Sequence, residues 1–232
     1  MRLEVGPAQA RWQLRLVEWL RCVVLMLTNV YVDGFNLYYG CLKGTPYKWL
    51  DLEALCHVLL PPNKIQRIRY FTAKVNGQAD PQQPVRQSTY LRALQTIPGL
   101  TVHFGHFLTS TVRMPLASPV PGGPRTVEVV KTEEKGSDVN LATYLMADAF
   151  RADADTFVVV SNDSDLMEPI RLVSQEVGYQ VGILNPHRNI SRALQRTQPS
   201  FTKQIRRGVL AASQFPEKLG DAHGTITKPA TW

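Results

Sequence analysis

The fold is decided by the stretch Val23–Gly34, which reads VVLMLTNVYVDG. Its apolar residues follow one another too continuously for a strand that is half exposed to water. Such a run is typical of a strand buried on both faces of a parallel sheet. The run stops at Asp33-Gly34, a pair that favours a turn. We therefore predict a first core strand over Val23–Val32, with an aspartate directly after it.

Helical and strand-like segments then alternate along the chain. Asp51 can cap the first of the helices. The expected elements are a helix from Leu52 to about Leu60, a strand at Ile65–Thr72, a helix at Gln82–Gln95, a strand at Leu100–Phe107, a helix at Asp138–Ala149, a strand at Thr156–Ser161, a helix at Leu166–Glu176 and a last core strand at Gln180–Leu184. This alternation predicts an α/β fold, a three-layer sandwich with a central, mostly parallel twisted sheet flanked by helices.

Two regions depart from the alternation. Leu108–Lys131 has prolines and glycines between two β-prone pieces, Thr109–Met114 and Arg125–Val130, and predicts an irregular hairpin. After Ser200 apolar residues become sparse, and Glu217–Trp232 is expected to be a loosely held tail. We divide the chain into an N-terminal extension (1–20), one domain (21–215) and a C-terminal tail (216–232).

The N-terminal extension resembles a secretory signal only superficially. Cys22–Leu27 is short for the apolar part of a signal, and no small-residue cleavage pattern follows it. A membrane span needs roughly 20 apolar residues, so this run is also too short to cross a bilayer. Residues 1–20 could form a short amphipathic helix, or they could reflect the choice of start codon rather than the native product.

Composition indicates a globular protein with a polyanionic partner. Hydrophobic residues make up 44% of the 232 residues and charged residues 19%, a balance that can fill a core. The net charge of +7 makes nucleic acid the leading partner class, ahead of an acidic membrane surface. The three cysteines, Cys22, Cys41 and Cys56, leave one thiol unpaired in any disulfide scheme, which favours a reducing, cytoplasmic location.

Aspartates occur where the expected core elements begin or end. Asp33 follows the first strand, Asp163 and Asp165 follow the strand that ends at Ser161, and Asp138 starts a helix. Ligands of open parallel sheets bind at the carboxyl ends of the strands, so adjacent first and fourth strands would bring these side chains together. Carboxylates that lie this close require a cation. Oxygen ligands suit Mg²⁺ or Mn²⁺.

Each aspartate also has a simpler interpretation. Asp33-Gly34 fits a turn, Asp138 a helix cap, and Asp163-Ser164-Asp165 an Asx turn before a helix. Taken singly, these interpretations are preferable. Taken together, four aspartates at one predicted sheet edge favour a metal cluster. Zinc is not expected, because His103 and His106 would point to opposite faces of a strand.

Three segments carry a resemblance to a known family: YVDGFNLYY at Tyr31–Tyr39, EKGSDVNLA at Glu134–Ala142 and VVSNDSDL at Val159–Leu166. In order and spacing they resemble the NYN domain family, LabA-like branch, of the PIN-like nuclease superfamily. The similarity runs from about Val23 to Leu184 and more weakly to Phe215. The resemblance implies a metal-dependent ribonuclease that uses Mg²⁺ or Mn²⁺ and acts on RNA. It also implies that the metal-binding and catalytic residues are Asp33, Asp138, Asp163 and Asp165.

The resemblance assigns further roles to neighbouring residues. Asn36 is expected to orient the substrate or a water on the metal, and Ser161 and Ser164 to steady the carboxylates by hydrogen bonds. Asn162 stands where glycine is common in the family, and Ser137 where valine or threonine is more usual.

Basic and aromatic residues near the cluster are candidates for contacts with RNA. Lys135 could meet a phosphate oxygen, and a solvated lysine is an equal alternative. A set of cations after the last expected strand could line a groove along the RNA backbone, or form only a solvated face: Arg188, Arg192, Arg196, Lys203, Arg206 and Arg207. Aromatic residues after the first strand could stack on unpaired bases, although most of them should be core: Phe35, Tyr38, Tyr39, Tyr47 and Trp49.

Three functions fit these residues. The first is a metal-dependent endoribonuclease with water as the nucleophile. The second is a catalytically silent RNA-binding regulatory module of the same fold, and the third is a phosphatase or phosphotransferase with Asp33 as its nucleophile. The complete set of aspartates favours the ribonuclease, with no membrane contact and no small-molecule cofactor. A homo-oligomer is left open.

Overall fold

A six-stranded parallel sheet forms the centre of the computed structural model, which describes residues 26–77 and 80–232. Its order is β3-β2-β1-β6-β7-β8, and every neighbouring pair is parallel. The strands are β1 (Met26–Asp33), β2 (Asn63–Thr72), β3 (Leu100–Phe104), β6 (Thr156–Val160), β7 (Gln180–Asn185) and β8 (Phe201–Gln204). The first strand of this sheet therefore lies beside the fourth, β6, which is the arrangement under which the aspartates were expected to meet.

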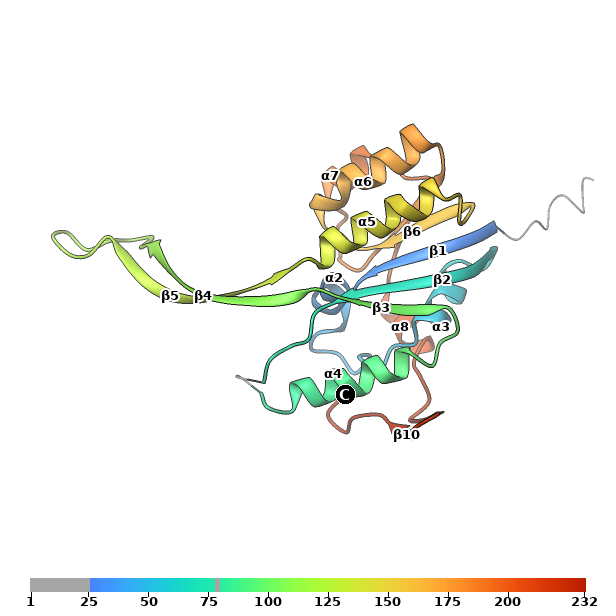
Figure 1. Cartoon of the computed structure of the whole chain (residues 1–232), viewed down its shortest axis with the longest axis horizontal. Coiled ribbons are helices and arrows are strands. Elements are labelled where there is room, and N and C mark those ends of the chain that lie inside the picture. Colours follow the sequence, from blue (N-terminus) through green and yellow to red (C-terminus); the bar gives the residue numbers. More distant parts are fainter. Residues whose placement is uncertain (1–25, 78–79) are drawn as a thin grey trace, which may run out of the picture.

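Helices cover both faces of the sheet, so the expected three-layer α/β sandwich is confirmed (Figure 1). One layer contains α5 (Ser137–Phe150), α6 (Met167–Arg171) and α7 (Arg192–Arg196); the other contains α3 (Leu52–Leu59), α4 (Gln83–Leu94) and α8 (Arg207–Ala212). The side chains of β1 alternate between two cores: Val30 and Val32 pack with the α3 and α4 side, and Tyr31 packs with the α5 side. The first strand is thus buried on both faces, as its unbroken apolar run predicted.

The expected helices occur with small changes at their ends. Asp51 caps α3, because its carboxylate accepts from the backbone amides of Glu53 and Ala54. The predicted helix over Leu166–Glu176 is divided into a 3₁₀ turn at Ser164–Leu166, α6, and a π-helical turn at Leu172–Val177. A short helix, α2 (Gly34–Leu37), follows β1 directly and continues as a π-helical turn at Tyr38–Leu42.

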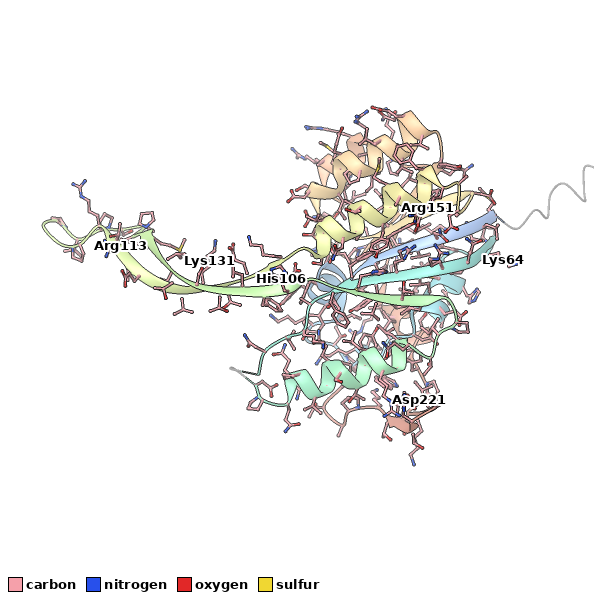
Figure 2. The ribbon with its side chains drawn as sticks, in the orientation of Figure 1. Lys64, His106, Arg113, Lys131, Arg151 and Asp221 are labelled. Atoms are coloured by element: carbon pink, nitrogen blue, oxygen red, sulfur yellow. The ribbon has the colours of Figure 1, made fainter. Side chains whose placement is uncertain are left out.

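The hairpin between the third and fourth sheet strands is longer than predicted. β4 (His106–Pro115) and β5 (Thr126–Lys135) form an antiparallel ribbon that projects away from the sheet at the end where α2 begins (Figure 1). Arg113 and Lys131 lie on this ribbon (Figure 2). The predicted strand Leu100–Phe107 breaks at Gly105, where a side chain would collide with Glu134 and the Lys135 backbone.

Two expectations about the C-terminal part were wrong. Gln180–Leu184 is not the last strand of the sheet, because β8 pairs with β7 beyond it. Glu217–Trp232 is not loosely held: β9 (Lys218–Asp221) and β10 (Gly224–Thr227) form a hairpin near α4, and Asp221 accepts from the Arg92 guanidinium at 2.5 Å. The Trp232 ring packs on Tyr90 with ring centroids 5.6 Å apart, and Ile226 is buried.

Our expectations for residues 1–20, and for the start of the first strand at residues 23–25, lie outside the described residues. Within the described part of the chain, every helix is too short or too polar to cross a bilayer.

Candidate metal centre

Three aspartates from distant parts of the chain meet at the carboxyl ends of β1 and β6. Asp33 is the last residue of β1, Asp163 follows β6, and Asp138 lies in the first turn of α5. One carboxylate oxygen from each lies within 4.8 Å of the other two. Oxygen ligands on opposite sides of Mg²⁺ are roughly 4 Å apart, so small side-chain rotations would let all three contact one ion.

The chemistry of this donor set fits a hard divalent cation. Among the described residues, none of the three carboxylates forms an ion pair with a lysine, arginine or histidine. Their negative charges therefore remain uncompensated by protein cations. Oxygen-only ligands select Mg²⁺ or Mn²⁺ over zinc.

Asp33 is held in place by two hydrogen bonds. Its Oδ1 accepts from the Asn36 backbone amide at 2.9 Å, which caps α2, and its Oδ2 accepts from the Ser161 hydroxyl at 2.9 Å. The turn interpretation of Asp33-Gly34 is thus wrong in form, because Asp33 caps a short helix, and the same carboxylate also belongs to the cluster. Gly34 is required here, since a Cβ at this position would lie 2.7 Å from the Phe71 carbonyl oxygen.

Asp163 is positioned by the turn that follows β6. Its backbone amide donates to the Ser161 hydroxyl at 3.0 Å, and its Oδ1 accepts from the Asp165 amide at 2.9 Å, as in the Asx turn considered from the sequence. The Asn162 amide in the same loop donates to the Asn36 side-chain oxygen at 2.9 Å. The ends of β1 and β6 are therefore joined by a short network of polar groups.

Asp138 does not cap its helix. Within the described residues its carboxylate accepts no hydrogen bond, and the Ser137 amide instead donates to Glu134 at 3.1 Å. Gly136 makes the turn from β5 into α5 with a positive φ of 95°, a conformation that favours glycine. Asp138 consequently reaches the cluster with its ligand oxygens free.

Burial and mutual repulsion raise the pKa of two of these carboxyl groups above the ordinary value. Burial, followed by the Asp138 and Asp163 carboxylates, raises the pKa of Asp33 to about 7, while the hydrogen bonds from Asn36 and Ser161 act in the opposite direction. Burial also raises the pKa of Asp138 to about 6, with added repulsion from Asp163, Glu134 and Asp165. A cation between the carboxylates would remove this repulsion and favour their charged forms.

The cluster opens into a cavity of about 370 Å³. Its walls include the aromatic rings of Phe35 and Phe107, which meet edge to face with centroids 5.8 Å apart. Phe107 comes from the root of the projecting hairpin. The complete lining is Asp33, Phe35, Asn36, Tyr39, Phe107, Glu134, Ser137, Asp138, Asp163 and His187.

The structure places the other predicted site residues differently. Asn36 lines the cavity. Ser161 does not line it, but its hydroxyl donates a hydrogen bond to Asp33. Asp165 is exposed and is not one of the three converging carboxylates, although it lies close enough to raise the pKa of Asp138. The cavity lining does not include Lys135, Ser164, Arg188 or Arg192.

Four lining residues were not anticipated from the sequence as part of the site: Phe107, Glu134, Ser137 and His187. Glu134 stands inside one of the quoted motifs, and its position before the Gly136 turn was the available signal. Phe107 and His187 follow from the path of the hairpin and of the loop after β7, which no local pattern specifies.

A second, basic cavity of about 470 Å³ adjoins the first. Arg188, Arg206 and Arg207 line it. The two cavities meet where His187 lies against Gly40, since a Cβ on Gly40 would come within 2.9 Å of the His187 ring. Lys203 is occupied elsewhere, because its ammonium donates to the Leu59 carbonyl oxygen at 2.7 Å.

A parallel sheet whose carboxyl edge carries three carboxylates, none of them paired with a cation among the described residues, defines an α/β protein with an acidic centre. The chain belongs to the NYN family: a family model described as NYN domain matches residues 27–209. The resemblance of the sequence motifs to the NYN family is thereby confirmed.

Two similar proteins extend this comparison. The chain is 31% identical over 234 residues to the 6-hydroxy-3-succinoylpyridine 3-monooxygenase HspA of Pseudomonas putida, a match that covers 88% of this chain and 75% of that protein. The fold is similar to the crystal structure of a protein of unknown function from Vibrio parahaemolyticus, with a TM-score of 0.52, 18% identity, and coverage of 82% of this chain and 97% of that one.

Proposed function

We propose that the protein is a metal-dependent ribonuclease that hydrolyses RNA phosphodiester bonds at the cluster of Asp33, Asp138 and Asp163. The observation that carries this proposal is the convergence of three carboxylates within 4.8 Å, without a cationic partner among the described residues. The family match supports it, because the NYN domain has a PIN-like nuclease fold.

Several residues in and beside the cavity have a role in this reaction. Asp33, Asp138 and Asp163 would hold Mg²⁺ or Mn²⁺, which when bound polarises a phosphate oxygen and makes water more acidic. The Asn36 side-chain oxygen is used by the Asn162 amide, so its NH₂ group is the part that can donate to the substrate. Asp165, exposed beside the cluster, is available to accept a proton or to bind a second ion.

The charge around the centre supports RNA as the substrate. The basic cavity of Arg188, Arg206 and Arg207 can bind phosphates that flank the one to be cut, and the chain has a net charge of +7. Lys135 and Arg192 remain proposed contacts at the periphery. Lys135 is half exposed on β5, where its ammonium lies 3.4 Å from Glu133.

A second candidate is oxidation of a small aromatic acid. The name of the Pseudomonas putida relative favours it, because that protein is called a monooxygenase of a hydroxylated succinoylpyridine. The carboxylate cluster matches hydrolytic metal chemistry more directly, so we rank oxidation second.

Cleavage of a mixed pool of labelled RNA with Mn²⁺ or Mg²⁺ tests the first proposal. We expect the wild type to cut the RNA. A chelator should abolish this cleavage, and the Asp163→Asn variant should lack it. The matched control is Asp155→Asn, an exposed aspartate at the opposite end of β6, which should cut like the wild type.

The remaining outcomes each discriminate. RNA binding without cutting under either metal would replace the ribonuclease with the silent RNA-binding module. Equal cutting by the wild type and by Asp163→Asn would show that the aspartate cluster is not the site of cleavage. Turnover of the hydroxylated pyridine acid instead of RNA would establish the second candidate.

A further inference from the structure

A third cavity, of about 470 Å³, shares two walls with the acidic one. Phe35 and Tyr39 line both cavities, and Gly34, the neighbour of Asp33, lines the new one. The volume lies within the roughly 300–1,000 Å³ that is typical of small-molecule sites. We call it the aromatic cavity, because its lining includes Phe35, Tyr38, Tyr39, Tyr70, Tyr90 and Trp232.

The rings of the aromatic cavity come from four separate parts of the chain. Tyr70 and Tyr90 meet edge to face with centroids 6.4 Å apart, and Tyr90 in turn packs on Trp232. Such a set can enclose a flat ring, since aromatic groups attract one another in offset and edge-to-face arrangements.

Tyr70 supplies a polar group that the protein itself does not use. Its side chain is only 7% exposed, and its hydroxyl makes no hydrogen bond within the described part of the chain. Tyr90, by contrast, donates to the Leu50 carbonyl oxygen at 2.8 Å. Burial raises the pKa of Tyr70, followed by the effect of the Asp33 carboxylate, so the hydroxyl stays protonated and can donate. Because Tyr70 lines the cavity, its hydroxyl is available to donate to a ligand bound there.

The charged groups of the aromatic cavity favour a ligand with negative charge. Lys48 lines the cavity and forms no ion pair with any described residue, whereas Arg86 is paired with Asp80. One lysine charge is therefore left uncompensated beside the aromatic rings.

We propose that the aromatic cavity binds an unpaired base of the RNA substrate, from a nucleotide next to the phosphate that is cut. The base lies among the aromatic rings, the Tyr70 hydroxyl donates to an acceptor on its edge, and Lys48 contacts a phosphate of the same strand. Phe35 and Tyr39 support this assignment, because they line both cavities. A base in the aromatic cavity would therefore lie beside the carboxylate cluster at which the phosphodiester is cut. This inference rests on the proposed ribonuclease function.

The test measures binding rather than cutting, in the full chain with Asp163→Asn as background. Fluorescence anisotropy of a short single-stranded RNA is compared with that of the same RNA with one base removed at each position in turn. We expect one abasic position to weaken binding by roughly 10- to 100-fold, the range for the loss of one stacked base.

Two variants with matched controls locate the effect. Tyr70→Phe and Lys48→Gln should each weaken binding of the intact RNA, and Tyr70→Phe should have little effect on the abasic one. The controls are Tyr179→Phe, under the opposite face of the sheet, and Lys64→Gln, at the far end of β2 (Figure 2). Both controls should bind like the background protein, and thermal unfolding verifies that all variants fold.

Each outcome decides the question. Equal binding of every abasic RNA, or no effect of either variant, would overturn the proposal. So would binding of pyridine carboxylates without binding of nucleoside monophosphates, which would assign the cavity to free aromatic acids. If the wild type fails to cut RNA while base-dependent binding persists, the ribonuclease function fails and the base site stands. If it cuts normally without base-dependent binding, only the base site fails.

Discussion

The Ser161 hydroxyl donates to the Asp33 carboxylate at 2.9 Å, across the boundary between β6 and β1. The hydroxyl oxygen of Ser161 also accepts from the Asp163 backbone amide at 3.0 Å, so one buried side chain contacts two candidate metal ligands and sets their spacing. The family resemblance implied this supporting role for Ser161, and its hydrogen bond to Asp33 is present in the structure.

Ser161→Ala should therefore weaken metal binding while the fold is retained. Loss of a group that orients metal ligands typically reduces affinity roughly 10- to 100-fold. Titration calorimetry with Mn²⁺ measures this change. Ser164→Ala is the matched control, because Ser164 is exposed and its hydroxyl forms no hydrogen bond with any described residue. Equal weakening in both variants would contradict the role given to Ser161.

Metal affinity should fall as the pH is lowered from 8 to 5. Asp33 and Asp138, with pKa values of about 7 and about 6, must lose their protons before they can bind a cation. Protons therefore compete with the ion, and affinity should fall roughly tenfold per pH unit just below pH 7 and more steeply below pH 6. Mn²⁺ titrations at several pH values measure the slope. An affinity that is constant between pH 5 and pH 8 would show that these carboxylates are not ligands.

Asp33→Asn should stabilise the metal-free protein at pH 8. Between pH 3.8, the ordinary value, and about 7, the native state keeps a proton on Asp33 that the unfolded chain has lost. The free energy of unfolding therefore decreases as the pH rises through this window, by on the order of a few kcal/mol. Asparagine avoids this cost, so its advantage should be present at pH 8 and small at pH 4.

Urea unfolding at the two pH values, with and without Mn²⁺, measures the effect of Asp33→Asn. Saturating Mn²⁺ should stabilise the wild type more than the variant, because ligand binding favours the native state. A variant that is less stable than the metal-free wild type at pH 8 would contradict the free-energy cost attributed to the ionised Asp33 carboxylate.

The parts of the fold that could be predicted are those that local sequence patterns specify. The apolar run before Asp33 specified a strand buried on both faces, and an aspartate after each of two adjacent strands was enough to bring Asp33 and Asp163 together. Asp138 joined them because its helix begins at the same edge. These inferences need only strand burial and the geometry of a parallel sheet.

The parts that were missed depend on contacts between distant residues. β8 reads FTKQ, four residues of which only Phe201 is apolar, and at the edge of the sheet this strand was too short and too polar to recognise. Trp232 belongs to the core around Trp49 and Tyr90, although the sequence around it is polar. Asp165 sits beside Asp163 in the sequence, but the 3₁₀ turn that starts there leaves it exposed and outside the three converging carboxylates.

Asp148 was not singled out from the sequence either, yet it lies in α5, is fully buried, and forms an ion pair with Arg69. It accepts from the Tyr31 hydroxyl at 2.8 Å and from the Arg69 guanidinium at 2.8 and 3.0 Å. Asp148→Asn should lower the free energy of unfolding by roughly 3–5 kcal/mol, because it leaves the Arg69 charge buried without its partner. Urea unfolding measures the loss, and Mn²⁺ affinity at the separate metal centre should not change. The double variant Asp148→Asn/Arg69→Met should recover part of the stability, since it removes the unpaired charge. A double variant less stable than Asp148→Asn alone would show that Arg69 stabilises the fold mainly by stacking on Tyr144, whose ring centroid lies 4.5 Å from the guanidinium carbon.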